Sequence, residues 1–203
     1  MTYVSSWNHR WEDDWRTALD RAYQSAQKSV QLGPNLPEAH VALGWALLWM
    51  RQHEAAIAAF ERGIALNPNF TNWHFPLSLV YAGEPARAIE ALDAHMRLDP
   101  FYEPYAPVTM GFACYMLKRY AEALPHFQAC VSRAPNMRAG RVGLAATYAQ
   151  LGQLGKAKAQ AAEVLRIEPF YTINRSPPIS VLKRPEDIEH FADGLRKAGL
   201  PEE

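Results

Sequence analysis

The chain has 203 residues, in which 21 Lys and Arg balance 21 Asp and Glu, and it has two cysteines. This length suffices for one ordinary core or one short solenoid. The zero net charge gives no reason to expect nucleic acid or an anionic membrane as the main partner. Because no apolar run reaches the roughly 18 residues that span a bilayer and the N-terminus lacks a signal-peptide layout, we expect a soluble, cytoplasmic protein.

A helix is predicted over residues 7–32, ahead of the regular part of the chain. Its tryptophans Trp7, Trp11 and Trp15 are spaced by four and therefore lie along one helical face. Two interpretations stay open: these side chains pack on the first full repeat, or an upstream partner covers them, because the end of a solenoid needs a polar cap. We interpret residues 1–36 as a degenerate N-terminal repeat.

Five prolines then recur at intervals of 32 to 35 residues: Pro34, Pro68, Pro100, Pro135 and Pro169. With each proline at position 32 of a 34-residue unit, four units follow: 37–68, 69–100, 104–135 and 138–169. Small residues fall at positions 8 and 20 and a large one at 24, as in Gly44, Ala56 and Phe60. Two antiparallel helices approach closely where side chains are small, and the proline ends the second helix.

This pattern resembles the tetratricopeptide repeat. The resemblance covers residues 34–169 and implies an all-α, right-handed superhelical solenoid of helix-turn-helix units, a fold that usually docks other proteins. Pro76 departs from the pattern, because it falls inside the first helix of the second unit. We therefore expect Thr71 or Asn72 to cap a short helix at roughly residues 73–82, with Pro76 near its first turn.

The repeat pattern stops after Pro169. Residues 170–184 predict an extended crossing segment, which a capping helix follows from Pro185. The apolar stripe of that helix is Ile188, Phe191, Ala192 and Leu195. Gly199 suits a left-handed C-cap with Leu200 folding back on Leu195, and we expect the chain to end naturally here.

The amino-acid sequence of residues 183–203 resembles the C-terminus of bacterial class III adenylate/guanylate cyclase-like proteins, in which tetratricopeptide repeats follow a catalytic domain. The sequence of residues 39–49 is also similar to the repeats of these proteins. The resemblance implies a regulatory module of a signalling protein, with an upstream catalytic domain as one possible partner. No catalytic residue can be carried over, because the cyclase domain is absent from this chain. The alternative is a free-standing adaptor or a homo-oligomerisation module.

In tetratricopeptide arrays the first helix of each unit, helix A, lines a concave groove. The resemblance implies an apolar and aromatic partner-binding groove made by Val41, Trp45, Leu48, Trp49, Leu77, Tyr81, Val108, Phe112, Tyr115 and Met116. It lacks the Lys and Asn with which related domains clamp the acidic tails of heat-shock chaperones. Three occupants stay open: residues 170–184 or the N-terminal helix of this chain, a helix or peptide of a partner protein, or a second copy.

Signals of an enzyme are weak. The seven histidines form no HExxH or other ligand spacing, and Cys114 and Cys130 fall at helix-packing positions, which favours buried free thiols. There is no GxGxxG, P-loop or GxSxG motif. We therefore expect no catalytic residue, no metal and no cofactor in this chain, and a protein or peptide as its partner.

Overall fold

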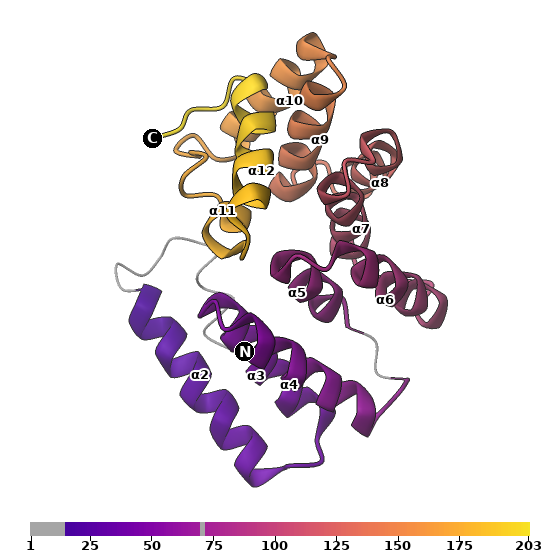
Figure 1. Ribbon diagram of the computed structural model, residues 1–203, viewed down its shortest axis with the longest axis vertical. Helices are drawn as coiled ribbons and strands as arrows, with labels where there is room; N and C mark the ends of the chain where they lie inside the picture. Colours follow the sequence, from indigo (N-terminus) through magenta and orange to yellow (C-terminus); the bar gives the residue numbers. More distant parts are fainter. Residues whose placement is uncertain (1–14, 70–71) are drawn as a thin grey trace. The chain divides into compact units, whose positions relative to one another are not determined.

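The computed structural model describes residues 15–69 and 72–203, and regular structure in these ranges is helical (Figure 1). The chain divides into two compact units, residues 1–78 and 79–203, with the division inside α5. The helices are α2 (Trp15–Leu32), α3 (Pro37–Trp49), α4 (His53–Leu66), α5 (His74–Ala82), α6 (Pro85–Leu98), α7 (Tyr105–Met116), α8 (Tyr120–Arg133), α9 (Arg138–Gln150), α10 (Leu154–Ile167), α11 (Pro177–Val181) and α12 (Pro185–Lys197).

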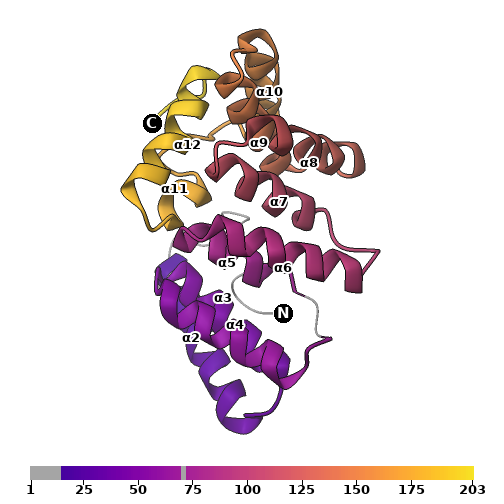
Figure 2. The same cartoon turned by 45° about the vertical axis from the view of Figure 1, so that its right-hand side comes forward.

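Successive helices pack as hairpins at the positions that the sequence predicts. In the first unit α3 crosses α4, and a Cβ atom at Gly44 would lie 3.0 Å from the ring of Phe60. In the second unit α7 crosses α8, α9 crosses α10, and α8 packs on α9 (Figure 2). A Cβ atom at Gly111 would again lie 3.0 Å from the ring of Phe127. The small residue at each crossing thus lets a large ring fill the space beside it.

Each repeat has a turn between its first helix, helix A, and its second helix, helix B. A residue in the left-handed backbone conformation closes each of these turns. These residues have φ values of +60°, +87°, +60° and +73° at Arg51, Gly83, Lys118 and Gly152. Each turn carries the same two backbone bonds; Gly83 N, for example, donates to Val80 O at 3.0 Å and Glu84 N to Leu79 O at 2.8 Å. This is the Schellman arrangement, which favours glycine. Two of the turns place a basic residue in this conformation instead.

The start of α5 confirms the predicted cap. The Oδ1 atom of Asn72 accepts hydrogen bonds from the backbone N–H groups of His74 at 2.7 Å and Phe75 at 3.3 Å. Helix α5 begins at His74, one residue after the predicted start, and ends at Ala82 as predicted. Pro76 therefore lies in the first turn, where the backbone N–H that it lacks would have no partner inside the helix.

At the N-terminus, α2 packs on α3 through Ala18, Ala22 and Ala26, which are buried. Trp15 at its start is 44% exposed. Trp7 and Trp11, with the predicted helix before Trp15, lie outside the described residues.

The tail after α10 differs from the expectation in one segment. Residues 177–181 form the short helix α11 within the stretch predicted to be extended, because Pro177 and Pro178 are compatible with a first helical turn. The capping helix α12 begins at Pro185 as predicted. Gly199 has φ +88° and Leu200 N donates to Leu195 O at 3.2 Å, as its C-cap requires.

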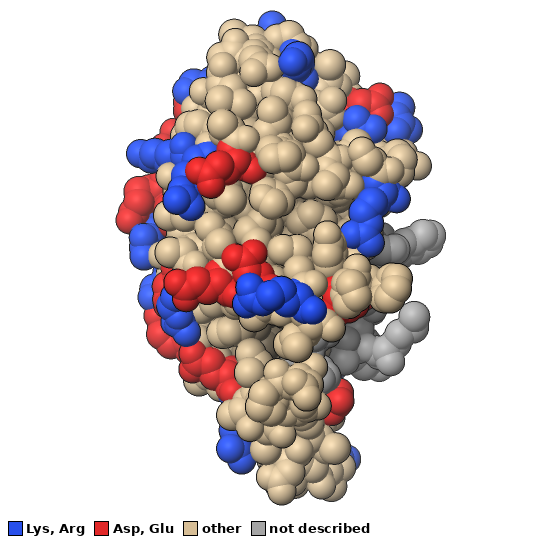
Figure 3. Space-filling view, turned by 90° about the vertical axis from the view of Figure 1, so that its right-hand side faces the viewer, with Lys and Arg blue, Asp and Glu red and all other residues tan. Residues whose placement is uncertain are grey.

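Acidic and basic side chains lie beside one another on the face shown in Figure 3 and do not gather into a stripe of one sign. In the described part of the chain, no helix is long and apolar enough to cross a membrane.

Candidate interaction surfaces

In the first unit, an aromatic cluster joins the end of α3 to the start of α5. The ring of Trp45 lies edge-to-face with those of Trp49 and Trp73, at centroid distances of 5.3 and 5.7 Å. His74 meets Trp45 edge-on at 4.3 Å and stacks on Trp73 at 4.0 Å. Each such pair stabilises by about 0.5–1.5 kcal/mol beyond its area burial. The three tryptophans are only half-buried, so the cluster also forms part of the surface.

His74 is neutral in this cluster. Its Nδ1 atom lies 2.9 Å from Oδ1 of Asn72, and an amide oxygen only accepts, so Nδ1 carries the proton. Burial lowers the pKa of His74 from 6.5 to about 4, because the surrounding rings replace the water that would solvate an imidazolium.

In the second unit, α12 covers the face that helices α7 and α9 present. Figures 1 and 2 both place it alongside α9, against which it chiefly packs, with further contacts to α7. Phe191 of α12 lies edge-to-face with Phe112 at 5.0 Å and with Tyr115 at 5.5 Å. Phe112 in turn meets Tyr81 at 5.9 Å. Aromatic rings from α5, α7 and α12 thus form one buried group.

Polar contacts fix the rotation of α12 on this face. The hydroxyl of Tyr115 donates to the backbone carbonyl of His190 at 3.2 Å, and that of Tyr120 lies 2.8 Å from His190 Nε2. The amide of Gln150 donates to Asp193 Oδ2 at 3.0 Å. Burial raises the pKa of Tyr115 and lowers that of His190, so both side chains are neutral near pH 7.

The segment before α12 is tied to the turn between α5 and α6. Lys183 N donates to Tyr81 O at 2.9 Å, and the Arg184 guanidinium donates to Gly83 O. Tyr81 lies in the last turn of α5 and Gly83 directly follows that helix, so the Arg184 guanidinium lies at a helix C-terminus, where a cation is favourable. The φ of Gly83 is +87°, which favours glycine, and a Cβ atom there would lie 2.1 Å from the Arg184 side chain, which would have to move.

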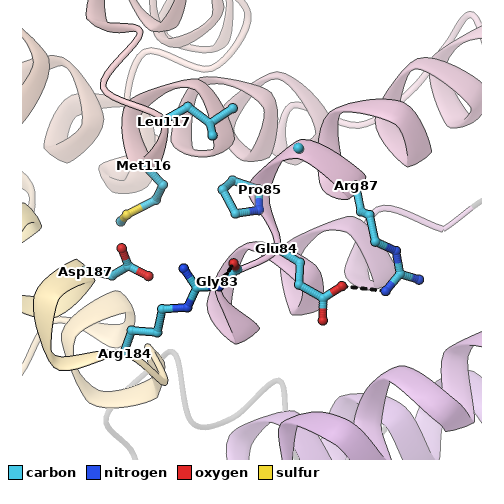
Figure 4. A pocket seen from close by; sticks show the side chains of 9 residues that line it. Gly83, Glu84, Pro85, Arg87, Met116, Leu117, Arg184 and Asp187 are labelled. Carbon is cyan, nitrogen blue, oxygen red and sulfur yellow. Dashed lines mark hydrogen bonds and ion pairs between the residues drawn. The ribbon is translucent and has the colours of Figure 1, made fainter.

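A pocket of about 380 Å³ opens beside this tie, between the α5–α6 turn, the end of α7 and the start of α12. Figure 4 shows the Arg184 guanidinium beside Gly83 and the Asp187 carboxylate between Arg184 and Met116. Burial raises the pKa of Asp187, and the nearby Arg184 opposes that shift. Sequence reasoning missed this pocket, because its walls come from segments about 100 residues apart.

The predicted groove residues fall into two groups. The half-buried group is Val41, Trp45, Trp49 and Val108; the buried group is Leu48, Leu77, Tyr81, Phe112, Tyr115 and Met116. A partner could reach the first group directly, whereas the second is packed inside the chain. That these residues form a partner-binding groove stays a prediction.

The internal occupant of the second unit's helix-A face differs from the one expected. Among the three occupants left open, the internal one was residues 170–184 or the N-terminal helix; in the structure it is α12 that covers Phe112 and Tyr115. One signal in the sequence could have indicated this contact. Gly194 lies beside the apolar stripe of α12, and a Cβ atom there would lie 2.3 Å from the Tyr115 hydroxyl oxygen.

The cysteines and the metal-ligating residue types can be placed in the described residues. Cys114 and Cys130 are buried free thiols, and burial raises the pKa of Cys130 to about 11. No group of three or more His, Cys, Asp or Glu in residues 15–69 and 72–203 is placed to hold a metal ion.

Two segments match family models described as tetratricopeptide repeats, residues 37–70 and 115–171. The chain contains tetratricopeptide repeats. No curated protein matches it in sequence.

Solved structures of tetratricopeptide proteins share the fold. TTC0263 of Thermus thermophilus aligns with a TM-score of 0.68 at 19% identity, over 96% of this chain and 95% of that one. The type IV pilus biogenesis factor PilW gives 0.67 at 14% identity, over 96% and 89%. YrrB, described as having an unusual peptide-binding site, gives 0.58 at 18%, over 87% and 92%. These alignments confirm the predicted all-α class of superhelical tetratricopeptide solenoids.

Proposed function

We propose that this chain is a protein-interaction module and that its partner docks on the aromatic cluster of Trp45, Trp49 and Trp73. The observation that carries the proposal is a difference between equivalent positions. Trp45 and Trp49 are half-buried, whereas Phe112 and Met116, at the same two positions of the repeat at residues 104–135, are buried. Aromatic side chains that remain accessible on helix A are the kind that anchor a partner. The half-buried Val41 lies on the same helix.

The test uses peptides selected from a displayed library for binding to the intact chain. We expect Trp45→Ala to weaken a selected peptide about 30-fold, the loss of about 2 kcal/mol typical of a buried aromatic anchor. The control is Phe101→Ala, because Phe101 is 89% exposed in the turn after α6 and lies outside helix A. Far-UV circular dichroism verifies that both variants fold. Equal weakening by the two variants, or none by Trp45→Ala, contradicts the proposal.

A finer proposal concerns the protein in which the module works. Service to an upstream cyclase-like catalytic domain rests on the resemblance of residues 183–203, to which the similarities reported above add no support. The alternative is a free-standing adaptor; the solved structures that align over 96% of this chain share its fold and do not decide between the two. Cytoplasmic location, the single-domain organisation and a homodimer stay predictions. Turnover of a nucleoside triphosphate by the purified chain with Mn²⁺ or Mg²⁺ would contradict the non-catalytic role.

A further inference from the structure

Helix α12 does not occupy the place of another repeat. In the second unit, α7 packs on the preceding helix B, α6, and α9 packs on α8. A fifth helix A would correspondingly pack on α10. Instead α12 packs chiefly on α9, touches α7, and makes few contacts with α10. It therefore lies along the helix-A face in the manner of a bound ligand.

The contacts define the chemistry that this face selects. Phe191 fills the aromatic group, Gly194 lets the backbone approach the Tyr115 hydroxyl, and Leu195 is fully buried. Asp193 accepts a hydrogen bond from Gln150 at 3.0 Å. The opposite side of α12 carries exposed charges such as Glu189 and Arg196. The complementary ligand is an amphipathic helix with an aromatic residue, a glycine three positions later and a leucine directly after it.

We propose that α12 is an exchangeable internal ligand, and that a partner helix of this pattern takes its place on the face formed by Tyr81, Phe112, Tyr115 and Gln150. This inference goes beyond the proposed function, because it concerns a different surface. The tie at Lys183 and Arg184 holds α12 close, so its effective concentration is high and the free face is a minor state. Apparent affinity for a partner helix then falls by the fraction of chains in which α12 has left.

The test uses a fluorescein-labelled peptide of residues 183–203 as the probe and the full-length chain as the receptor. Gly194→Ala introduces a methyl group within 2.3 Å of the Tyr115 hydroxyl and weakens α12 without altering the face itself. We expect it to bind the probe at least tenfold more tightly than the unaltered chain. Gly155→Ala is the matched control, because a Cβ atom at this exposed position of α10 meets nothing within 4 Å.

A second receptor variant guards against an effect peculiar to Gly194. Phe191→Asp removes the aromatic anchor of α12 and should raise probe affinity by a similar factor. Adding Phe112→Ala to either variant should abolish the gain. No gain in both variants overturns the inference, and so does a gain that survives Phe112→Ala. A further outcome is that the unaltered chain dimerises at high concentration while the Gly194→Ala chain does not. In that case the face binds a second copy, and the partner-helix assignment is wrong.

The outcome separates this inference from the proposed function. The probe is the chain's own helix, so a failed exchange leaves the Trp45 result unaffected. If Trp45→Ala abolishes peptide binding and no exchange occurs at α12, the docking proposal stands. Only the proposal that α12 is an exchangeable ligand is then contradicted.

Discussion

His74 shows how a single half-buried side chain couples the aromatic cluster to pH. Its ring is stacked on Trp73, meets Trp45 edge-on, and donates through Nδ1 to Asn72. This arrangement suits a neutral imidazole, because burial removes much of the water that would solvate an imidazolium. The pKa therefore falls to about 4, from 6.5 in an unfolded chain.

The sign of the pH dependence follows from these two values. Above pH 6.5 the side chain is neutral in both states. Between pH 6.5 and 4 the unfolded chain binds a proton that the folded chain does not, so stability falls as pH falls. The full shift corresponds to a loss of about 3 kcal/mol.

We expect His74→Phe to reduce this loss, because phenylalanine keeps the aromatic contacts and cannot titrate. The measurement is denaturant unfolding followed by tryptophan fluorescence at pH 7, 5.5 and 4, with the slope of stability against pH compared between the two chains. Other buried histidines add the same slope to both, so only the difference counts. Identical slopes would show that His74 is not the group that titrates.

At the scale of elements, the repeat turns depend on one residue each. Gly152 has φ +73°, and a Cβ atom there meets nothing within 4 Å. Any cost of a side chain at this position therefore comes from backbone strain, which for an L-residue in the left-handed region is about 1–2 kcal/mol.

Gly152→Ala should lower the free energy of unfolding by about 1 kcal/mol. Gly155→Ala, three residues later in α10 and equally unobstructed, should raise it by about 0.5 kcal/mol through reduced freedom of the unfolded chain. Chemical denaturation of both variants measures this opposite pair. The same sign for both would show that conformation does not decide the effect at Gly152.

The positions of the helices could be predicted from the sequence better than the contacts between helices. The spacing of Pro185, Phe191 and Leu195 was enough to predict α12, because helix period, N1 proline and C-cap are local properties. Its docking face was not predicted, since that face depends on pairs such as Tyr115 and His190, 75 residues apart in the chain. No short-range pattern encodes such a pair. The pocket beside Arg184 was missed for the same reason.

At the scale of the whole molecule, each repeat stabilises its neighbours, and the fold follows from a pattern that recurs. This is why the proline intervals and the crossing residues Gly44 and Phe60 predicted the architecture. Candidate site residues were predicted less well. That the helix-A positions form a partner-binding groove stays a prediction, and in the second unit α12 of the chain itself covers Phe112 and Tyr115. We therefore propose that partners bind the Trp45 cluster and the face that α12 covers.

The central claim is that α12 occupies the helix-A face of residues 79–203. Its most direct test is the nuclear Overhauser contact between the ring protons of Phe191 and those of Phe112 and Tyr115 in the intact chain in solution. The account predicts strong cross-peaks, since the centroids lie 5.0 and 5.5 Å apart, and predicts their loss in Gly194→Ala. Absence of these cross-peaks in the unaltered chain, with α12 amides exchanging as fast as in an unfolded peptide, would contradict it.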